Sequence, residues 1–105
     1  MTLTFDQIAD TCKQLAQTFG IECEIKDYSN YGWKGISLLV DHFGGCAVNL
    51  CYLLETKRCY DWIHSSREVE ITDLDQLRKY AGRKIEREKK VRLTEDLCDF
   101  INSQY

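Results

Sequence analysis

The sequence predicts an α+β fold: a single two-layer domain, residues 1–105, in which an antiparallel sheet of about four strands in a meander carries its helices mainly on one face. Two observations lead to this prediction. Helical apolar spacing occurs at both ends of the chain, and short apolar runs separated by turn-forming residues fill the middle. Strands joined by tight turns pair antiparallel. One N-terminal helix and two C-terminal helices are then available to cover the sheet.

The N-terminal helix is predicted between Thr4 and Gly20. Thr4 and Gln7 form the capping-box pattern of a helix start. Gly20 stands where a residue in the left-handed conformation commonly ends a helix. Between them, apolar residues recur at the spacing of one helical face, which predicts that this face is buried. The stripe consists of Phe5, Ile8, Ala9, Cys12, Leu15, Ala16 and Phe19.

The segment Ile36–Leu54 is the most apolar run of the chain and is predicted to form the central hairpin of the sheet. A polar, glycine-containing cluster at 41–45 divides it into strands at 36–41 and 46–54. The second half also matches a helical stripe, so a helix over 46–54 is the alternative. The strand is favoured because the run is short and follows two glycines.

Further strands are predicted on either side of this hairpin. Residues 21–26 alternate between apolar and charged side chains, as in a strand with one face in water. Residues 59–65 form a fourth strand, and residues 67–71 either continue it past a bulge or form a short strand of their own. The side chains expected on one face of the fourth strand are Tyr60, Trp62 and His64.

Two helices are predicted after the sheet. The first begins near Thr72, with Asp75 as its capping-box partner. Gly82 favours a break in this helix, because glycine costs about 1 kcal/mol relative to alanine in a helix interior. Thr94 caps the second helix. The apolar stripes are Leu74, Leu77, Ala81 and Ile85 in the first helix and Leu97, Phe100 and Ile101 in the second.

Charge is segregated along the chain. Residues 1–77 carry 6 basic and 12 acidic side chains (−6), residues 78–92 carry 8 and 2 (+6), and residues 93–105 carry none and 3 (−3), which add up to the net charge of −3. An asymmetry of this size suggests that the basic segment meets an anionic partner.

Four basic residues of the segment 78–92 fall on one face of the predicted helix, opposite its apolar stripe. Such a row of cations can bind the acidic surface of a protein or neutralise several phosphates of a nucleic acid. Glu86 and Glu88 are interspersed and no aromatic residue stands between the cations, so a solvated helix surface is the third interpretation. The four residues are Lys79, Arg83, Arg87 and Lys90.

An aromatic loop is predicted at residues 27–35, where Tyr28, Tyr31 and Trp33 stand among polar and glycine residues. One interpretation is that a ring folds over the sheet edge as a lid on the core. The other is that the loop binds a partner, because tyrosine and tryptophan are favoured anchors of protein interfaces.

The six cysteines are predicted to be reduced thiols, because no secretory pattern follows Met1 and the chain is long enough to build its own core. No Cys-x2-Cys pair occurs, so a zinc site is disfavoured and no metal is expected. Cys46 and Cys59 are the thiols that merit testing as nucleophiles, through His42 and Arg58 respectively. The residues considered as zinc ligands are His42, Cys46, Cys51, Cys59 and His64.

No phosphate-binding glycine loop, nucleophile elbow or dinucleotide fingerprint occurs in the chain. The sequence therefore favours a small non-enzymatic interaction or regulatory protein without a cofactor, an inhibitor or adaptor of the kind that phages and mobile elements also encode. Its expected partner is a protein, with an acidic surface or within a nucleic-acid-handling complex, which binds the basic row and the aromatic loop. Nucleic-acid binding by 78–92 is the alternative, and a thiol- or zinc-containing protein is the second alternative.

Location and assembly are predicted from the same composition. No run of about 18 apolar residues is present, so we expect no membrane contact and a cytoplasmic protein. The acidic remainder of the chain could pair with the basic segment of a second copy, which would give a homodimer.

Overall fold

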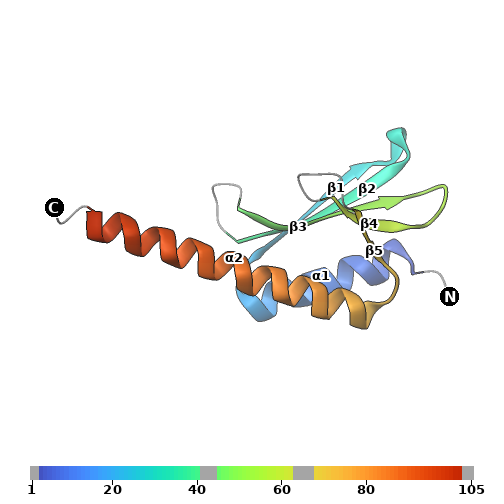
Figure 1. Ribbon diagram of the computed structural model, residues 1–105. Helices are drawn as coiled ribbons and strands as arrows, with labels where there is room; N and C mark the ends of the chain where they lie inside the picture. The colour runs from blue at the N-terminus through green and yellow to red at the C-terminus, as the bar shows by residue number, and fades with distance from the viewer. Residues whose placement is uncertain (1–2, 41–44, 63–67, 103–105) are drawn as a thin grey trace.

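Five antiparallel strands form one sheet in the order β1-β2-β3-β4-β5, and the helices α1 and α2 cover one of its faces (Figure 1). The computed structural model describes residues 3–40, 45–62 and 68–102, with residues 68 and 91–102 described by their backbone alone. The predicted α+β class and meander order are confirmed. The elements are α1 (Phe5–Phe19), β1 (Glu22–Tyr28), the 3-10 turn η1 (Ser29–Tyr31), β2 (Trp33–Leu39), β3 (Cys46–Leu53), β4 (Cys59–Trp62), β5 (Glu68–Ile71) and α2 (Leu74–Asn102).

Within the described residues the protein has one strand more and one helix fewer than predicted. Residues 68–71 form the separate strand β5, paired with β4 through Cys59 opposite Ile71 and Asp61 opposite Val69. The C-terminal region forms one helix, α2, in place of two. The segment 46–54, for which a helix was the alternative, forms the strand β3 over Cys46–Leu53, which is hydrogen-bonded to β2 on one side and to β4 on the other.

The hydrophobic core lies between the sheet and the two helices. Ile36 of β2 pairs with Leu50 of β3, and Leu38 pairs with Val48, and all four side chains are buried. The predicted central hairpin therefore lies at the centre of the face that the helices cover. The helices contribute Ile8, Ala9, Cys12 and Ala16 from α1 and Leu77, Ala81 and Ile85 from α2.

Neither α1 nor α2 covers the opposite side of the sheet, which we call the open face (Figure 1). Successive residues of a strand point to opposite sides of a sheet, so the positions between the core residues lie on this side. In the three central strands, β2 to β4, these positions include Trp33, Gly35, Ser37, Asn49, Cys51, Tyr60 and Trp62.

The connection between β1 and β2 is shorter than the predicted loop at 27–35. β1 extends to Tyr28 and β2 starts at Trp33, so only η1 and Gly32 lie between them. Asp27 Oδ1 accepts hydrogen bonds from the backbone N–H and the hydroxyl of Ser29, an Asx turn that bends the chain out of β1. Gly32 has φ of +87°, a conformation that favours glycine.

Helix α1 begins and ends as predicted. Thr4 and Gln7 exchange both capping-box hydrogen bonds, at 3.0 and 3.2 Å, and Gly20 is left-handed with φ of +66°. No basic residue occurs in the last turn of α1. Lys89 of α2 supplies one instead, because its ammonium donates to the carbonyl oxygen of Phe19. A cation at this position interacts favourably with the negative end of the α1 dipole. The hydrogen bond also joins the two helices.

Helix α2 is continuous over 29 residues, through both positions that were predicted to interrupt it. Its N-cap is Asp73 rather than Thr72, since the Asp73 carboxylate accepts from the backbone N–H of Gln76 at 2.8 Å. The prediction of a break at Gly82 is wrong, because residues packed in the core on both sides of it hold the helix. The prediction of a new helix start at Thr94 is also wrong. The C-terminal part of α2 extends beyond the sheet, and the molecule measures 56 × 26 × 23 Å (Figure 1).

Replacing Gly82 with alanine is expected to raise the free energy of unfolding by up to about 1 kcal/mol, the difference between the helix propensities of the two residues. A β-carbon there would lie 3.7 Å from Cζ of Phe19, an ordinary van der Waals contact. Urea unfolding measures the change. Gly20→Ala is the matched control, expected to lose about 1 kcal/mol because of its positive φ. A less stable Gly82→Ala variant would mean that α1 and α2 are too close for a methyl group.

Candidate functional site

The basic ridge, defined as Lys79, Arg83, Arg87 and Lys90, lies on the side of α2 opposite the buried residues of that helix. All four side chains are exposed. Lys79, Arg83 and Arg87 have no ion-pair partner among the described residues. Exposed and unpaired cations at helical spacing are available to an anionic partner.

The other described basic residues of α2 contact the protein itself. Arg78 pairs with Asp75 at 3.0 Å within the helix, and Lys84 pairs with Asp61 of β4 at 3.1 Å. Lys89 donates to the end of α1. Lys84 and Lys89 thus join α2 to the rest of the fold, whereas Lys79, Arg83 and Arg87 face outward.

Tyr28 and Trp33 stack against each other across β1 and β2, with ring centroids 4.5 Å apart and ring planes at 25°. The Trp33 ring lies over Gly35, because a β-carbon built on Gly35 would be 3.0 Å from Cζ3 of Trp33. Both rings therefore lie on the open face and do not form a lid on the core. Tyr31, in η1, is 81% exposed.

The structure does not bring the aromatic residues and the basic ridge together. Lys34, which follows Trp33 in β2, places its ammonium 5.0 Å from the ring centroid of Phe5 in α1. Lys34 is thus on the helix side of the sheet, and Trp33 is on the other side. The two predicted parts of the partner site lie on opposite sides of the sheet and form two separate surfaces.

β4 adds two aromatic residues to the open face, Tyr60 and Trp62, and Trp62 is 54% exposed. The sequence predicted that these two share one face of a strand. It did not show that this is the face of Trp33, because that depends on the register of β2, β3 and β4. His64, predicted beside them, and His42 lie outside the described residues.

Asp61 is a buried carboxylate at the centre of a polar cluster between β4 and α2. Its side chain is fully buried. Oδ1 accepts from the backbone N–H of Asn49 at 3.0 Å, and Oδ2 accepts from Lys84 Nζ at 3.1 Å and from the hydroxyl of Tyr80. Burial, followed by the hydrogen bond to Asp61, raises the pKa of Tyr80, which stays protonated. This cluster attaches α2 to the sheet.

Sequence patterns indicate little of this cluster, because Asp61 is 19 residues from Tyr80 and 23 residues from Lys84 along the chain. One signal was available. Asp61 alternates with the outward Tyr60 and Trp62, so it points toward the core, where a carboxylate requires donors.

Five cysteines have described side chains, and none of these five forms a disulfide. Burial raises the pKa of Cys12 and of Cys59 to about 12, and it also raises the pKa of Cys23 and Cys46. Arg58 does not activate Cys59, because its guanidinium lies toward Glu70, at 3.9 Å. Among the described residues, no group of three or more His, Cys, Asp or Glu side chains is placed to hold a metal ion.

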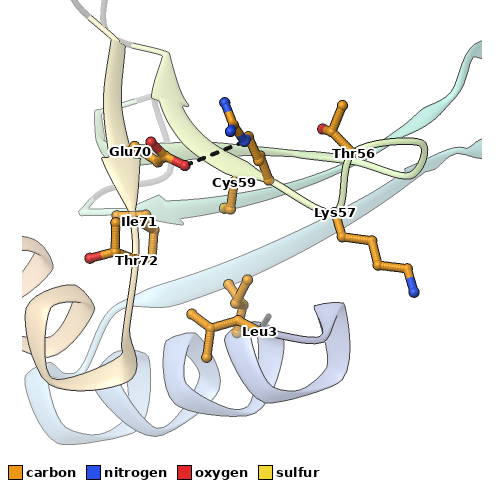
Figure 2. Close-up of a pocket in the computed structure, with 9 residues that line it drawn as sticks. Leu3, Thr56, Lys57, Cys59, Glu70, Ile71 and Thr72 are labelled. Carbon is orange, nitrogen blue, oxygen red and sulfur yellow. Dashed lines mark ion pairs between the residues drawn. The ribbon is translucent and has the colours of Figure 1, made fainter. Parts of the chain in front are cut away.

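A hollow of about 230 Å³ lies between the N-terminal end of α1, the β3–β4 turn and the end of β5 (Figure 2). Leu3, Cys59 and Ile71 line it with apolar atoms, and the Arg58–Glu70 ion pair lies at its rim. Ligand pockets commonly measure about 300–1,000 Å³. The hollow is smaller and offers no buried polar group besides its backbone, so we assign no ligand to it.

Comparisons with protein-family models, with curated proteins and with solved structures find no match to this chain. In the part of the chain that the structure describes, no helix is long and apolar enough to cross a membrane. The basic ridge and the open face are therefore the features from which function is inferred.

Proposed function

We propose that the protein is a small non-enzymatic interaction protein, an inhibitor or adaptor, that binds the acidic surface of a partner protein through the basic ridge of α2. The observation that carries this proposal is the division of the cations of α2. Lys84 and Lys89 are tied to the fold, whereas Lys79, Arg83 and Arg87 are exposed and have no ion-pair partner among the described residues.

The geometry of the ridge suits a protein surface. From Lys79 to Lys90 the helix rises about 16 Å, which fits within an interface of about 800 Å² per partner. Exposed charges of one sign speed association and select complementary surfaces more than they add affinity. Binding through the ridge should therefore weaken as salt is raised.

Nucleic acid is the second candidate partner. The observation in its favour is that α2 extends beyond the sheet, so the end of the helix could enter a groove (Figure 1). One feature favours a protein instead. No aromatic residue stands between the cations of the ridge to stack on bases.

Reversing two charges of the ridge, in the variant Arg83→Glu/Arg87→Glu, is expected to weaken binding to a fluorescein-labelled glutamate-rich peptide by about tenfold or more at low salt. Fluorescence anisotropy measures the affinity, and circular dichroism shows that the variant is folded. Lys13→Glu/Arg78→Glu changes the net charge equally at exposed positions off the ridge, and should retain near-normal binding.

Two results would contradict the proposal. An equal loss in both double variants would show that only net charge matters. Tighter binding of a duplex oligonucleotide than of the acidic peptide, with a steep salt dependence, would identify nucleic acid as the ligand of the ridge. We place the thiol alternative below both, because burial raises the pKa of Cys12, Cys23, Cys46 and Cys59.

A further inference from the structure

We propose that the open face of the sheet is a second interaction surface, which binds an arginine-bearing segment of a partner protein. This goes beyond the proposed function, because the open face lies on the side of the sheet away from α2 and selects the opposite charge. The argument uses three features: aromatic side chains around small residues, carboxylates at both edges, and a guanidinium of the protein already bound there.

The middle of the open face is made of small residues. Gly35 pairs with Cys51 and Ser37 pairs with Asn49 across β2 and β3, and the Ser37 hydroxyl donates to the Asn49 side chain at 3.0 Å. Large aromatic residues stand on two sides of them. Tyr28 and Trp33 lie at one end, and Tyr60 and Trp62 lie along β4.

The exposure of Trp62 sets the open face apart from an ordinary solvated sheet face. Strand positions on a solvent-facing side of a sheet usually carry polar side chains. Trp62 instead presents 54% of its surface to solvent, and Tyr28 of β1 presents 36%. A tryptophan ring face attracts a cation more strongly than any other aromatic side chain does.

Carboxylates lie at both edges of this face. β1 contributes Glu22 and Glu24, and β5 contributes Glu70. Glu24 contacts Lys26 at 3.8 Å and Glu70 contacts Arg58 at 3.9 Å, with all four side chains well exposed. Exposed pairs at such distances contribute little, so an incoming cation can share these carboxylates.

Arg58 shows how a guanidinium fits this surface. It lies between the Glu70 carboxylate and the Tyr60 side chain, and its hydrogen bond with Tyr60 raises its pKa. A carboxylate beside an aromatic ring is the combination that recognises arginine by a charged hydrogen bond and by stacking. Among the described residues, no cation lies over the ring of Trp62, which leaves that position for a guanidinium of the partner.

Two other occupants fit less well. A nucleic acid could stack bases on the aromatic rings, but the carboxylates at both edges repel phosphates. A second copy that met this face with its own open face would set glutamate against glutamate. Strands about 4.8 Å apart make a five-stranded face about 20 Å wide, enough for one extended or helical segment.

Tryptophan fluorescence offers a direct test, because both tryptophans of the chain, Trp33 and Trp62, lie on the open face. We expect a labelled arginine-rich nonapeptide to bind the full chain with a saturable change in tryptophan emission. Anisotropy of the peptide label gives the affinity. Trp62→Ala should weaken binding at least fivefold, and Glu24→Gln/Glu70→Gln should weaken it at least threefold.

Matched controls separate this surface from the basic ridge. Tyr31→Ala, which removes an exposed aromatic ring outside the sheet, should leave peptide affinity within about twofold. Arg83→Gln/Arg87→Gln should also leave the affinity for the arginine-rich peptide within about twofold. The same variant should weaken binding of the acidic peptide to the ridge. Failure of one surface is thus distinguishable from failure of the other. Trp62 is largely exposed, so its replacement should not prevent folding, and circular dichroism checks this.

Three results would overturn the inference. The first is arginine-peptide affinity that is unchanged in folded Trp62→Ala. The second is a single-stranded oligonucleotide that binds more tightly than the peptide and quenches the same tryptophans. The third is self-association of the protein, seen by light scattering, that Trp62→Ala abolishes while the peptide fails to bind.

Discussion

Replacing Asp61 with alanine is expected to lower the free energy of unfolding by about 3–5 kcal/mol, the usual cost of breaking a buried ion pair from one side. The Asp61 side chain is fully buried and accepts three hydrogen bonds, from Asn49, Tyr80 and Lys84. Alanine would leave an ammonium, a hydroxyl and a backbone N–H without their acceptor. Urea or thermal unfolding monitored by circular dichroism measures the loss.

Two further variants separate the contributions to this cluster. Tyr80→Phe removes one neutral donor and should cost about 1 kcal/mol. Lys84→Met leaves the carboxylate buried with two donors and should cost about 2–3 kcal/mol. The double variant Asp61→Leu/Lys84→Met replaces both charges by apolar groups. It should recover much of the stability lost in Asp61→Ala, because buried ion pairs are often no more stable than apolar pairs of similar size.

The result for Asp61→Ala also decides what the cluster does. A loss below about 1 kcal/mol would show that the site stays hydrated and that α2 does not depend on it. A large loss in Asp61→Ala, together with a small coupling between Asp61 and Lys84, would assign the stability to Tyr80 and to the backbone of Asn49 instead.

Helix α1 and the central hairpin could be predicted because their signals are local. Thr4, Gln7 and Gly20 specify both ends of α1 within a few residues of sequence. The hairpin is visible as two apolar runs around a turn. Its strand–helix ambiguity at 46–54 was a real limit of periodicity, since a short apolar run fits both patterns until its neighbours are known.

The continuity of α2 could not be predicted because it depends on packing. Gly82 is a weak helix former, yet it faces Phe19 of α1, and Ala81 and Ile85 beside it are completely buried. Burial of these residues outweighs a propensity difference of about 1 kcal/mol. The N-cap of α2 could not be predicted either, because the role of Asp73 depends on where β5 ends.

The open face was only partly predictable. Sequence alternation placed Tyr60 and Trp62 on one side of a strand, and composition singled out Trp33. That all three share one surface follows from the pairing of Cys51 with Gly35 on one side and with Tyr60 on the other. Pairing across three strands has no local signature, so aromatic residues far apart in sequence could not be assigned to one site.

Raising the pH from about 7.5 to about 10 is expected to lower the free energy of unfolding by about 3 kcal/mol, with two buried thiols as the main cause. The pKa of Cys12 and of Cys59 is raised from 9.0 to about 12 in the folded protein, first of all by burial. Below pH 9 both thiols are protonated in the folded and unfolded states, so their contribution is fully present.

The sign follows from the protons bound in each state. Between about pH 9 and pH 12 the unfolded chain releases both thiol protons while the folded protein keeps them, so stability falls by about 1.4 kcal/mol per pH unit for each thiol. The raised pKa of Cys23, of Cys46 and of Tyr80 acts in the same direction.

Urea unfolding under reducing conditions at a series of pH values tests this expectation. The double variant Cys12→Ala/Cys59→Ala should be somewhat less stable near pH 7.5, because it leaves small cavities, but its stability should fall less steeply above pH 9. Equal slopes for the variant and the unchanged protein would mean that Cys12 and Cys59 ionise alike in both states. That result would also contradict the placement of these thiols in the core, where Cys12 and Cys59 belong to the same buried cluster as Ile8 and Leu77.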